Sequence, residues 1–182
     1  MSIAVLLAAG KSSRTTVMKP LYRVGGRPLV DLQIATLRSY GYRVAVILGY
    51  RAEALEDAIS EPCMLYRNEA YEEGMFSSVK VACRVLKGED LLLCHIDRPV
   101  ADRAVFEALE QAGAELAVAR FRGERAPPVY LSGEMAEELI ASPMRRLDTW
   151  VLSRAELCYV DVDDPRVVQN ANTDTLLRRY FD

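Results

Sequence analysis

The sequence IAVLLAAGKSSR at residues 3–14 decides how the rest of the chain is interpreted. Its first seven residues, Ile3 to Ala9, are all apolar, and small and charged residues follow them at once. A short apolar run of this kind predicts a buried strand that ends in a loop close to a ligand. The run is far shorter than the roughly 20 apolar residues of a membrane-spanning helix, so we expect no membrane partner.

Further short apolar runs alternate along the chain with segments of helical spacing. With the first strand at Ser2–Ala8, the other predicted strands are Arg43–Leu48, Cys63–Tyr66, Asp90–His95, Glu115–Arg120, Pro128–Leu131 and Glu156–Val162. The predicted helices are marked by Val30, Ile34 and Leu37, by Leu55 and Ile59, by Val79, Cys83 and Leu86, by Val105 and Leu109, and by Thr173–Tyr180. This alternation predicts an α/β fold in which helices cover both faces of a mostly parallel sheet. The less regular second half predicts one or two antiparallel strands.

Length and composition narrow the class of protein. The 182 residues are expected to form a single domain, residues 1–182, because domains usually contain about 100–200 residues. A formal net charge of −3 argues against a nucleic-acid-binding protein, which usually carries a basic excess. The four cysteines are widely scattered, without the short spacing of zinc or redox motifs, so we expect reduced thiols and a cytoplasmic protein.

Ligands of open α/β sheets bind at the carboxyl ends of strands, so the loops there hold the candidate site residues. The first loop follows Ala8 and contains Gly10, then Arg14 and Lys19, whose small and cationic side chains suit a phosphate group. It lacks a glycine that a Walker loop requires, since Val5 occupies that position, and it lacks the dinucleotide pattern G-x-G-x-x-G. A solvated basic loop without a ligand explains these residues equally well.

The second loop follows Tyr66 and leads into the segment Asn68–Val79. Ser77 or Ser78 is placed to cap the helix predicted there, and the free N–H groups of a helix start suit an anion or the polar edge of a base. Capping alone is an equally good interpretation of these serines, because serine is a preferred cap residue.

The third loop follows His95 and contains Asp97, directly after a strand of leucines. A carboxylate at this place can hold Mg²⁺ beside a triphosphate, because Mg²⁺ combines few carboxylates with phosphate oxygens and water. The other interpretation is that Asp97 complements the dipole of a helix opened by Pro99. His95 is the only histidine and has no partner motif, so we interpret it as a structural residue at the strand end.

Together these motifs resemble the signature of the MobA-like or MocA-like NTP transferases, the molybdenum cofactor guanylyl- and cytidylyltransferases. The family pattern is L-A-[AG]-G-x-[SG]-x-R-[MF]-G, followed by K-x-L and G-[KR]-P-L. The residues that match it are Leu7, Ala8, Ala9, Gly10, Ser12, Arg14, Lys19, Leu21, Gly26, Arg27, Pro28 and Leu29. Later matches are N-x(5)-G-M-x-S-S from Asn68 to Ser78, D-x-P from Asp97 to Pro99, and N-x-N-T from Asn170 to Thr173.

The chain also departs from the family pattern. Thr15 and Thr16 replace the usual Met-Gly, and Asp174 replaces the proline that usually follows Thr173. Pro127 stands in place of the histidine of a frequent G-H-P-V stretch. These changes concern the conformation of the first loop and the contacts made with an acceptor.

The resemblance implies a three-layer, Rossmann-like fold of the nucleotide-diphospho-sugar transferase type, and a role for each matching residue. The implied nucleotide-binding residues are Leu7, Ala8, Ala9, Gly10, Lys19, Asn68, Gly74, Ser77 and Ser78. The implied catalytic residues are Arg14 and Lys19, which stabilise charge on the triphosphate, and Asp97, which holds Mg²⁺ as the cofactor. Asn172 is expected to be a second metal ligand, although capping of the last helix explains it equally well.

The implied function is transfer of NMP from CTP or GTP to a phosphorylated acceptor, such as molybdopterin, with release of pyrophosphate. The residues Ala8-Ala9-Gly10, where guanylyl relatives commonly have Ala-Gly-Gly, favour CTP. Two alternatives stay open. One is a transferase for a sugar phosphate or another small phosphate, and the other is a non-catalytic nucleotide-binding or cofactor-chaperone protein.

Overall fold

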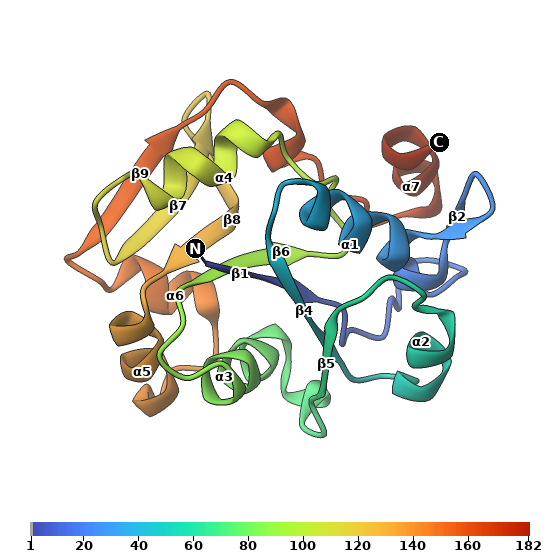
Figure 1. The fold of residues 1–182 in the computed structure, drawn as a ribbon, viewed down its shortest axis with the longest axis horizontal. Helices are drawn as coiled ribbons and strands as arrows, with labels where there is room; N and C mark the ends of the chain where they lie inside the picture. The colour runs from blue at the N-terminus through green and yellow to red at the C-terminus, as the bar shows by residue number, and fades with distance from the viewer. Residues whose placement is uncertain (1) are drawn as a thin grey trace.

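The fold is a mixed β-sheet with helices on both faces (Figure 1). The structure, a computed structural model, describes residues 2–182. Within those residues, seven strands form one sheet in the order β5-β4-β1-β6-β8-β7-β9. They are β1 (Ile3–Leu7), β4 (Arg43–Leu48), β5 (Met64–Arg67), β6 (Leu91–His95), β7 (Leu116–Phe121), β8 (Glu124–Leu131) and β9 (Leu157–Asp161). Each overlaps a strand predicted from the sequence, and the predicted α/β class is confirmed.

The direction of the strands changes at β8. β1 is parallel to β4 and β6, β4 to β5, and β7 to β9, whereas β8 is antiparallel to its neighbours β6 and β7. This agrees with the antiparallel pairing expected in the second half.

β8 begins at Glu124 and not at the predicted Pro128. Arg122 and Gly123 both have positive φ, 49° and 86°, and form a tight turn that starts β8 directly after β7.

Helices pack against both faces of the sheet. They are α1 (Leu29–Ser39), α2 (Ala52–Ala58), α3 (Met75–Val85), α4 (Arg103–Glu110), α5 (Gly133–Ala141), α6 (Leu147–Leu152) and α7 (Asp174–Phe181), with short 3₁₀ helices η1 (Lys19–Leu21), η2 (Tyr71–Glu73) and η3 (Pro165–Val168). Buried side chains of α1, α2, α4 and α7 belong to one core, and those of α3, α5 and α6 to the other. Figure 1 shows α3 and α5 on the opposite side of the sheet from α1 and α4.

The central strand β1 contributes to both cores. Ala4 and Leu6 belong to the first core, and Ile3, Val5 and Leu7 belong to the second. All five residues are buried. A parallel strand covered on both faces has no solvent side, which is why its sequence is a continuous apolar run and does not alternate with polar residues.

Some elements were not among the sequence predictions. A hairpin of β2 (Arg23–Val24) and β3 (Arg27–Pro28) turns through Gly25 and Gly26, both at positive φ. The helices α5 and α6 were also missed. They have nine and six residues and bury few side chains, among them Trp150, so their apolar periodicity is too short to stand out in the sequence.

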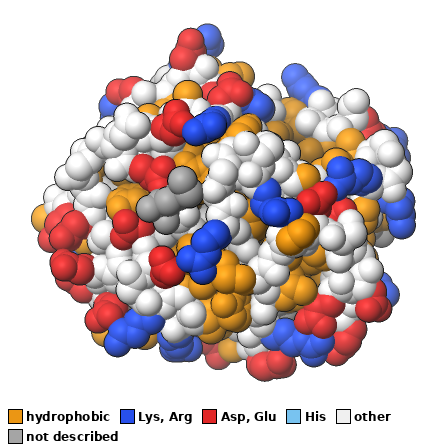
Figure 2. Space-filling view, viewed as in Figure 1, with side chains coloured by type: hydrophobic (Ala, Val, Ile, Leu, Met, Phe, Trp, Pro, Cys, Tyr) orange, Lys and Arg blue, Asp and Glu red, His pale blue; other side chains and the backbone are white. Residues whose placement is uncertain are grey.

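The helices and the charged side chains show whether the chain has a membrane span or a basic patch. Among residues 2–182, no helix has both the length and the apolar character needed to cross a membrane. On the face shown in Figure 2, Lys and Arg side chains are interspersed with Asp and Glu and do not gather into a basic patch. This mixture agrees with the net charge of −3.

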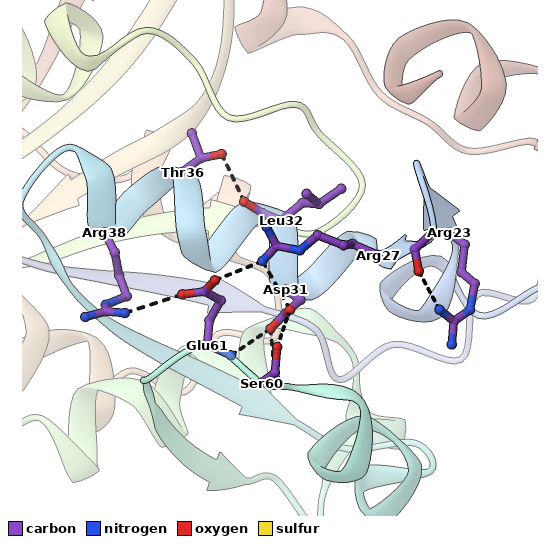
Figure 3. A network of polar contacts seen from close by, with 9 residues as sticks. Arg23, Arg27, Asp31, Leu32, Thr36, Arg38, Ser60 and Glu61 are labelled. Carbon is purple, nitrogen blue, oxygen red and sulfur yellow. Dashed lines mark hydrogen bonds and ion pairs between the residues drawn. The ribbon is translucent and has the colours of Figure 1, made fainter.

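A buried carboxylate joins α1 to the loop between α2 and β5 (Figure 3). Asp31 is 2% exposed and accepts hydrogen bonds from the Ser60 N–H (2.9 Å), the Ser60 hydroxyl (2.7 Å) and the Glu61 N–H (2.8 Å). Arg27 donates to the same carboxylate at 3.2 Å and to Glu61, which also contacts Arg38. Burial raises the pKa of Asp31, but the hydrogen bonds outweigh it and hold the pKa below its usual value of 3.8.

We predict that Asp31→Asn lowers the free energy of unfolding at pH 7 by about 1–3 kcal/mol, because the amide leaves a buried donor without an acceptor. Since the pKa is lowered in the folded state, the carboxylate stabilises the fold fully above the unfolded pKa, and this contribution is lost as the pH falls through the folded pKa. The difference between the variant and the wild type in urea unfolding should therefore shrink below about pH 4.

Asp57→Asn is the matched control, because Asp57 is exposed on α2 and its carboxylate makes no hydrogen bond within the described residues. An equal loss of stability in both variants would contradict the role given to Asp31. So would a loss for Asp31→Asn that stays the same at every pH.

Candidate active site

The candidate site lies at the carboxyl ends of β1 and β6, which are neighbours in the centre of the sheet (Figure 1). Leu7 of β1 is opposite His95 of β6, so the loops after both strands begin at the same edge. The loop after β5 reaches this edge through η2 and leads into α3. The strand order reverses at β1, between β4 and β6, and ligands of open α/β sheets bind at such a reversal.

One cavity of about 420 Å³ lies between these loops. Its lining residues are Leu7, Ala9, Gly10, Lys11, Ser12, Lys19, Tyr71, Glu72, Gly74, Met75, Ser78, His95, Ile96 and Asp97. The predicted site residues in this lining are Leu7, Ala9, Gly10, Lys19, Gly74, Ser78 and Asp97. The predicted site residues outside it are Ala8, Arg14, Asn68, Ser77 and Asn172. All three sequence motifs therefore contribute to one cavity.

The first loop is held against the end of β4 by its backbone. The Ala8 N–H donates to the Ile47 carbonyl (3.0 Å), and the Tyr50 N–H donates to the Ala9 carbonyl (3.1 Å). Gly49 lies so close that a Cβ atom on it would be 2.8 Å from both the Cβ and the carbonyl oxygen of Ala9. The Ala8 N–H and the Ala9 carbonyl are thus already hydrogen-bonded within the protein. Glycine at position 49 permits the close approach of this segment to Ala9.

Lys19 brings three distant segments together at the edge of the cavity. Its ammonium donates to Oδ2 of Asp97 and to Oδ1 of Asn172, both at 2.9 Å. The Lys19 side chain is 8% exposed and that of Asp97 is 23% exposed, so the ion pair is largely shielded from water. Such an ammonium needs these partners, because a buried charge without a partner is strongly destabilising.

The same two oxygens are the predicted metal ligands. Oδ2 of Asp97 and Oδ1 of Asn172 both point at one position, which the Lys19 ammonium occupies. Within residues 2–182, no group of three or more His, Cys, Asp or Glu side chains could hold a metal ion. A hard cation at this position would need further oxygens from water or a ligand, which is how Mg²⁺ binds beside phosphates.

The helix ends near the site exclude two simpler interpretations. α4 starts at Arg103 and not at Pro99, so Asp97 is not placed to complement the dipole of this helix. α7 is capped by Thr173, whose hydroxyl accepts a hydrogen bond from a backbone N–H of the first turn, and not by Asn172. The side chains of Asp97 and Asn172 are instead directed at Lys19.

Arg14 lies on the exposed part of the first loop, where its guanidinium donates to Oδ1 of Asn172 at 3.2 Å. Two departures from the family pattern meet here, because the Thr16 N–H donates to the Asp174 carboxylate at 3.0 Å. The Thr15 hydroxyl contacts two carbonyl oxygens of the loop itself. The loop is therefore held in place without the usual Met-Gly.

Asn68 fastens the loop after β5 to the start of α3. It is 2% exposed, and its amide donates to the hydroxyls of Ser77 (2.8 Å) and Ser78 (2.9 Å). Its Oδ1 accepts a hydrogen bond from the Ala70 N–H at 3.0 Å. Both ends of the amide are thus bonded within the protein, and the residue positions Ser78 in the wall of the cavity.

The predicted capping of this helix by Ser77 or Ser78 is wrong. The N-cap position of α3 is Gly74, at a φ of 98°, and no side chain caps the helix. A backbone with this φ favours glycine, so the helix starts at Met75 and both serines fall inside its first turns. The hydroxyl of Ser77 donates back to the Gly74 carbonyl at 2.7 Å.

His95 has a position that the sequence does not reveal. Its side chain is partly exposed and lines the cavity, while its Nε2 atom is buried without a hydrogen-bond partner in the described residues. Burial lowers the pKa of His95 to about 4, although the nearby Asp97 opposes the shift, so the imidazole is neutral at pH 7. No motif surrounds this histidine, so its unused nitrogen could be found only from the structure.

A second cavity of about 470 Å³ adjoins the first and shares Gly74, Met75 and His95 with it. Its other lining residues are Glu73, Phe76, Val118, Arg125, Ala126, Pro127, Val129, Arg145, Arg146, Leu147, Asp148 and Val151. Because β8 is antiparallel to β6, its residues before Val129 lie beside the carboxyl end of β6. The sequence points to this cavity through Pro127, at the position of the family histidine, and through the shared Gly74.

A family model for the MobA-like NTP transferase domain matches residues 4–156. The chain belongs to the MobA-like NTP transferase family. The resemblance inferred from the motifs is confirmed, and the matched range contains the first loop, the Asn68–Ser78 segment and Asp97. Asn172 lies beyond the matched range of the MobA-like domain, although the structure brings it to Lys19.

Among curated proteins, the MobA-like chain is similar to a 2-aminoethylphosphonate cytidylyltransferase from Lancefieldella rimae. The two are 29% identical over 113 residues, which are 57% of this chain and 46% of that protein. The chain spans about half or less of the length of the first curated relatives that it matches.

Solved structures share the whole fold of the MobA-like chain. A nucleotidyl transferase from Methanothermobacter thermautotroptrophicus superimposes with a TM-score of 0.86 at 20% identity, covering 100% of this chain and 96% of that one. Molybdopterin-guanine dinucleotide biosynthesis protein A from Archaeoglobus fulgidus has a TM-score of 0.75 at 20% identity, covering 98% of this chain and 96% of that one. These likenesses establish the nucleotidyltransferase type of fold.

We predict that Asn68→Ala lowers the free energy of unfolding by about 1–3 kcal/mol, because the buried groups around the amide lose their partners. The change should also speed amide hydrogen exchange in η2 and at the start of α3, the segments that Asn68 joins. Exchange in β9, at the far edge of the sheet, should stay the same.

Ser77→Ala is the control for this prediction, since it removes one of the two hydroxyls that accept from Asn68 and leaves the other in place. Its effect on stability should be smaller. Unchanged exchange at the start of α3 in Asn68→Ala would show that the residue does not hold this loop.

Proposed function

We propose that the protein is a Mg²⁺-dependent nucleotidyltransferase that moves NMP from CTP or GTP to a phosphorylated acceptor and releases pyrophosphate. The observation that supports this most is the pair of adjoining cavities. The Lys19–Asp97 ion pair lies in the wall of the first cavity, and His95 lies in the wall of both. Two substrates that react with each other need two sites with a common boundary.

In this proposal the nucleotide occupies the first cavity. Its triphosphate lies beside the ammonium of Lys19 and near Gly10 and Ser12, which allow close approach because Gly10 has no side chain and that of Ser12 is small. Arg14 adds a guanidinium at the outer edge, with donors in a geometry that matches phosphate oxygens. These cations offset the charge of the triphosphate, as charge-assisted hydrogen bonds do at other phosphate sites.

The oxygens of Asp97 and Asn172 fit a hard cation, because Mg²⁺ and Mn²⁺ prefer oxygen ligands and accept most of them from water and phosphate. When bound, the metal would neutralise charge on the phosphate oxygens of the nucleotide. The ammonium of Lys19 donates to Oδ2 of Asp97 and to Oδ1 of Asn172. We infer that its ammonium gives up at least one of them on binding, since the triphosphate offers it new partners.

The transfer needs positioning and charge neutralisation more than a covalent intermediate. An oxygen of the acceptor phosphate forms a bond to the α-phosphorus of the NTP. The bond from the α-phosphorus to the bridging oxygen breaks, and that oxygen leaves with its electron pair as part of pyrophosphate. The acceptor phosphate is largely ionised at neutral pH, because its second pKa is about 6, so it needs no general base.

Different observations favour the candidate substrates. The residues Ala8-Ala9-Gly10 and the name of the Lancefieldella relative favour CTP. The name of the Archaeoglobus structure favours molybdopterin as the acceptor, and the phosphonate in the name of the Lancefieldella relative favours a small phosphate or phosphonate as the second candidate. A non-catalytic nucleotide-binding protein would bind NTP and release no pyrophosphate.

Asp97→Asn tests the proposed reaction. We expect the wild type to release pyrophosphate from CTP or GTP when Mg²⁺ and molybdopterin are present. The rate of pyrophosphate release should be about 100-fold or more lower in the variant, because an amide attracts a cation far less strongly than a carboxylate does. Pyrophosphate release is measured for each NTP with molybdopterin, glucose 1-phosphate and 2-aminoethylphosphonate. Preference for GTP would show that the alanines do not select CTP.

Asp163→Asn is the matched control, since Asp163 is exposed and makes no side-chain hydrogen bond within the described residues. Asp163→Asn should keep the melting temperature of the wild type within about 3 °C, because surface changes rarely exceed about 0.5 kcal/mol. Asp97→Asn should still fold but melt at a lower temperature, because the buried Lys19 ammonium loses its charged partner and keeps only an amide oxygen there, so turnover is compared at a temperature at which both variants are folded. Wild-type turnover in Asp97→Asn would remove the residue from the mechanism, and absence of turnover with every acceptor in the wild type would overturn the proposed reaction.

Lys19→Gln tests whether the ammonium occupies the metal position. Without nucleotide, this variant should bind Mn²⁺ roughly fivefold or more tightly than the wild type, because removing a like charge a few ångströms away is worth about 1 kcal/mol even in water. Electron paramagnetic resonance of free Mn²⁺ measures the affinity, and Lys87→Gln, on an exposed lysine paired with Glu137, is the control. Equal or weaker Mn²⁺ binding in Lys19→Gln would place the metal elsewhere.

A further inference from the structure

The second cavity has an apolar middle. Side chains of Phe76, Val118, Val129, Leu147 and Val151 form this part of its wall, and they come from α3, β7, β8 and α6. A sugar placed here would bury several hydroxyl groups against side chains that offer no hydrogen bonds, which is unfavourable. An apolar body of similar size gains from the same contact.

The rim of this cavity carries two arginines without a counter-ion. Arg125 on β8 and Arg145 between α5 and α6 are exposed, and neither forms an ion pair or a side-chain hydrogen bond within residues 2–182. Arg146 is different, because both oxygens of Asp148 accept from it, at 3.0 and 2.7 Å. Glu73, the remaining acid in the wall, also lines a neighbouring hollow with Arg145, but it forms no ion pair with Arg125 or Arg145 within the described residues. The wall therefore has two arginine side chains that no ion pair occupies within the described residues.

The inner end of the cavity offers a different contact. His95 lies in the wall that the two cavities share, and its Nε2 atom is buried without a partner in the described residues. A buried nitrogen without a partner is costly unless a ligand or a water satisfies it. His95 itself lies at the boundary between the sites of the two proposed substrates.

We propose that the second cavity binds an acceptor with an apolar body and an anionic group at each end. The reacting phosphate lies at the inner end and is bonded by Nε2 of His95, and the second anion lies between Arg125 and Arg145. The identity of the inner group rests on the proposed function, whereas the apolar body and the outer anion rest on the cavity alone. Such a site disfavours simple sugar phosphates, and it disfavours aminoalkyl phosphonates, whose far end is cationic.

The test uses titration calorimetry on the full chain, saturated with Mg²⁺ and a CTP analogue with a methylene bridge between its α- and β-phosphorus. The ligands are 2-naphthyl phosphate, the same molecule with a carboxylate at position 6, and glucose 1-phosphate. The carboxylate should bind roughly fivefold more tightly than 2-naphthyl phosphate, because ion pairs at an exposed rim contribute modestly. Glucose 1-phosphate should bind roughly tenfold more weakly than 2-naphthyl phosphate, because it lacks the apolar body.

Arg125→Gln combined with Arg145→Gln should abolish the advantage of the carboxylate and leave the binding of 2-naphthyl phosphate unchanged. The control combines Arg84→Gln with Arg179→Gln, two exposed arginines that line neither cavity, and should keep the advantage. The proposed outer site is overturned if the wild type binds both naphthyl ligands equally, or if the advantage persists without Arg125 and Arg145.

The inner contact is tested with His95. His95→Phe should weaken both naphthyl phosphates by the same factor, and His95→Gln, which keeps a polar donor, should restore most of the affinity. If His95→Phe binds them as the wild type does, or if Gln and Phe are equally weak, the histidine does not contact the phosphate.

These titrations need no turnover, so they separate this site from the reaction. If the carboxylate preference depends on the two arginines but the wild type releases no pyrophosphate with any acceptor, the proposed reaction fails and the outer site stands. If pyrophosphate is released but the two naphthyl ligands bind alike, the reaction stands and the outer site is overturned.

Discussion

The buried ammonium of Lys19 is the contact on which the arrangement of the site depends. It joins the first loop to the loop after β6 and to the segment before α7, through Asp97 and Asn172. Because this charge is shielded from water, the three segments can separate only by leaving it without partners. The Ala171 N–H adds a hydrogen bond to the Asp97 carbonyl at 2.8 Å. Residues near the C-terminus thus belong to the candidate site, although the family match ends at residue 156.

The central part of the fold could be predicted from the sequence because its physics is local. A strand such as β1, covered on both faces, must be apolar at every position, and the following loop must be small and polar to meet a ligand. The same reasoning placed Gly10, Lys19 and Asp97, which line one cavity. It could not show that the Asn68 amide donates hydrogen bonds to two serine hydroxyls, because their positions depend on where the chain turns at Gly74.

The second cavity could not be predicted for a different reason. Its wall takes side chains from α3, β6, β7, β8, α6 and the loop before α6, and no single motif spans these elements. It exists because one antiparallel strand carries Ala126 and Pro127 to the edge where β6 ends at His95. A sequence pattern records residues that are close along the chain, whereas this wall is made by residues that only the sheet order brings together. The missed role of His95 follows from the same limitation.

The hydrogen bond between the Thr16 N–H and the Asp174 carboxylate links two departures from the family pattern. Viewed along the sequence they are separate substitutions, one in the first loop and one near the C-terminus. In space they are two halves of a single contact, with a backbone donor on one side and a carboxylate on the other. The two departures are therefore coupled. In a hybrid protein with only its N-terminal half from this chain, the Thr16 N–H would lose the Asp174 carboxylate that accepts its hydrogen bond.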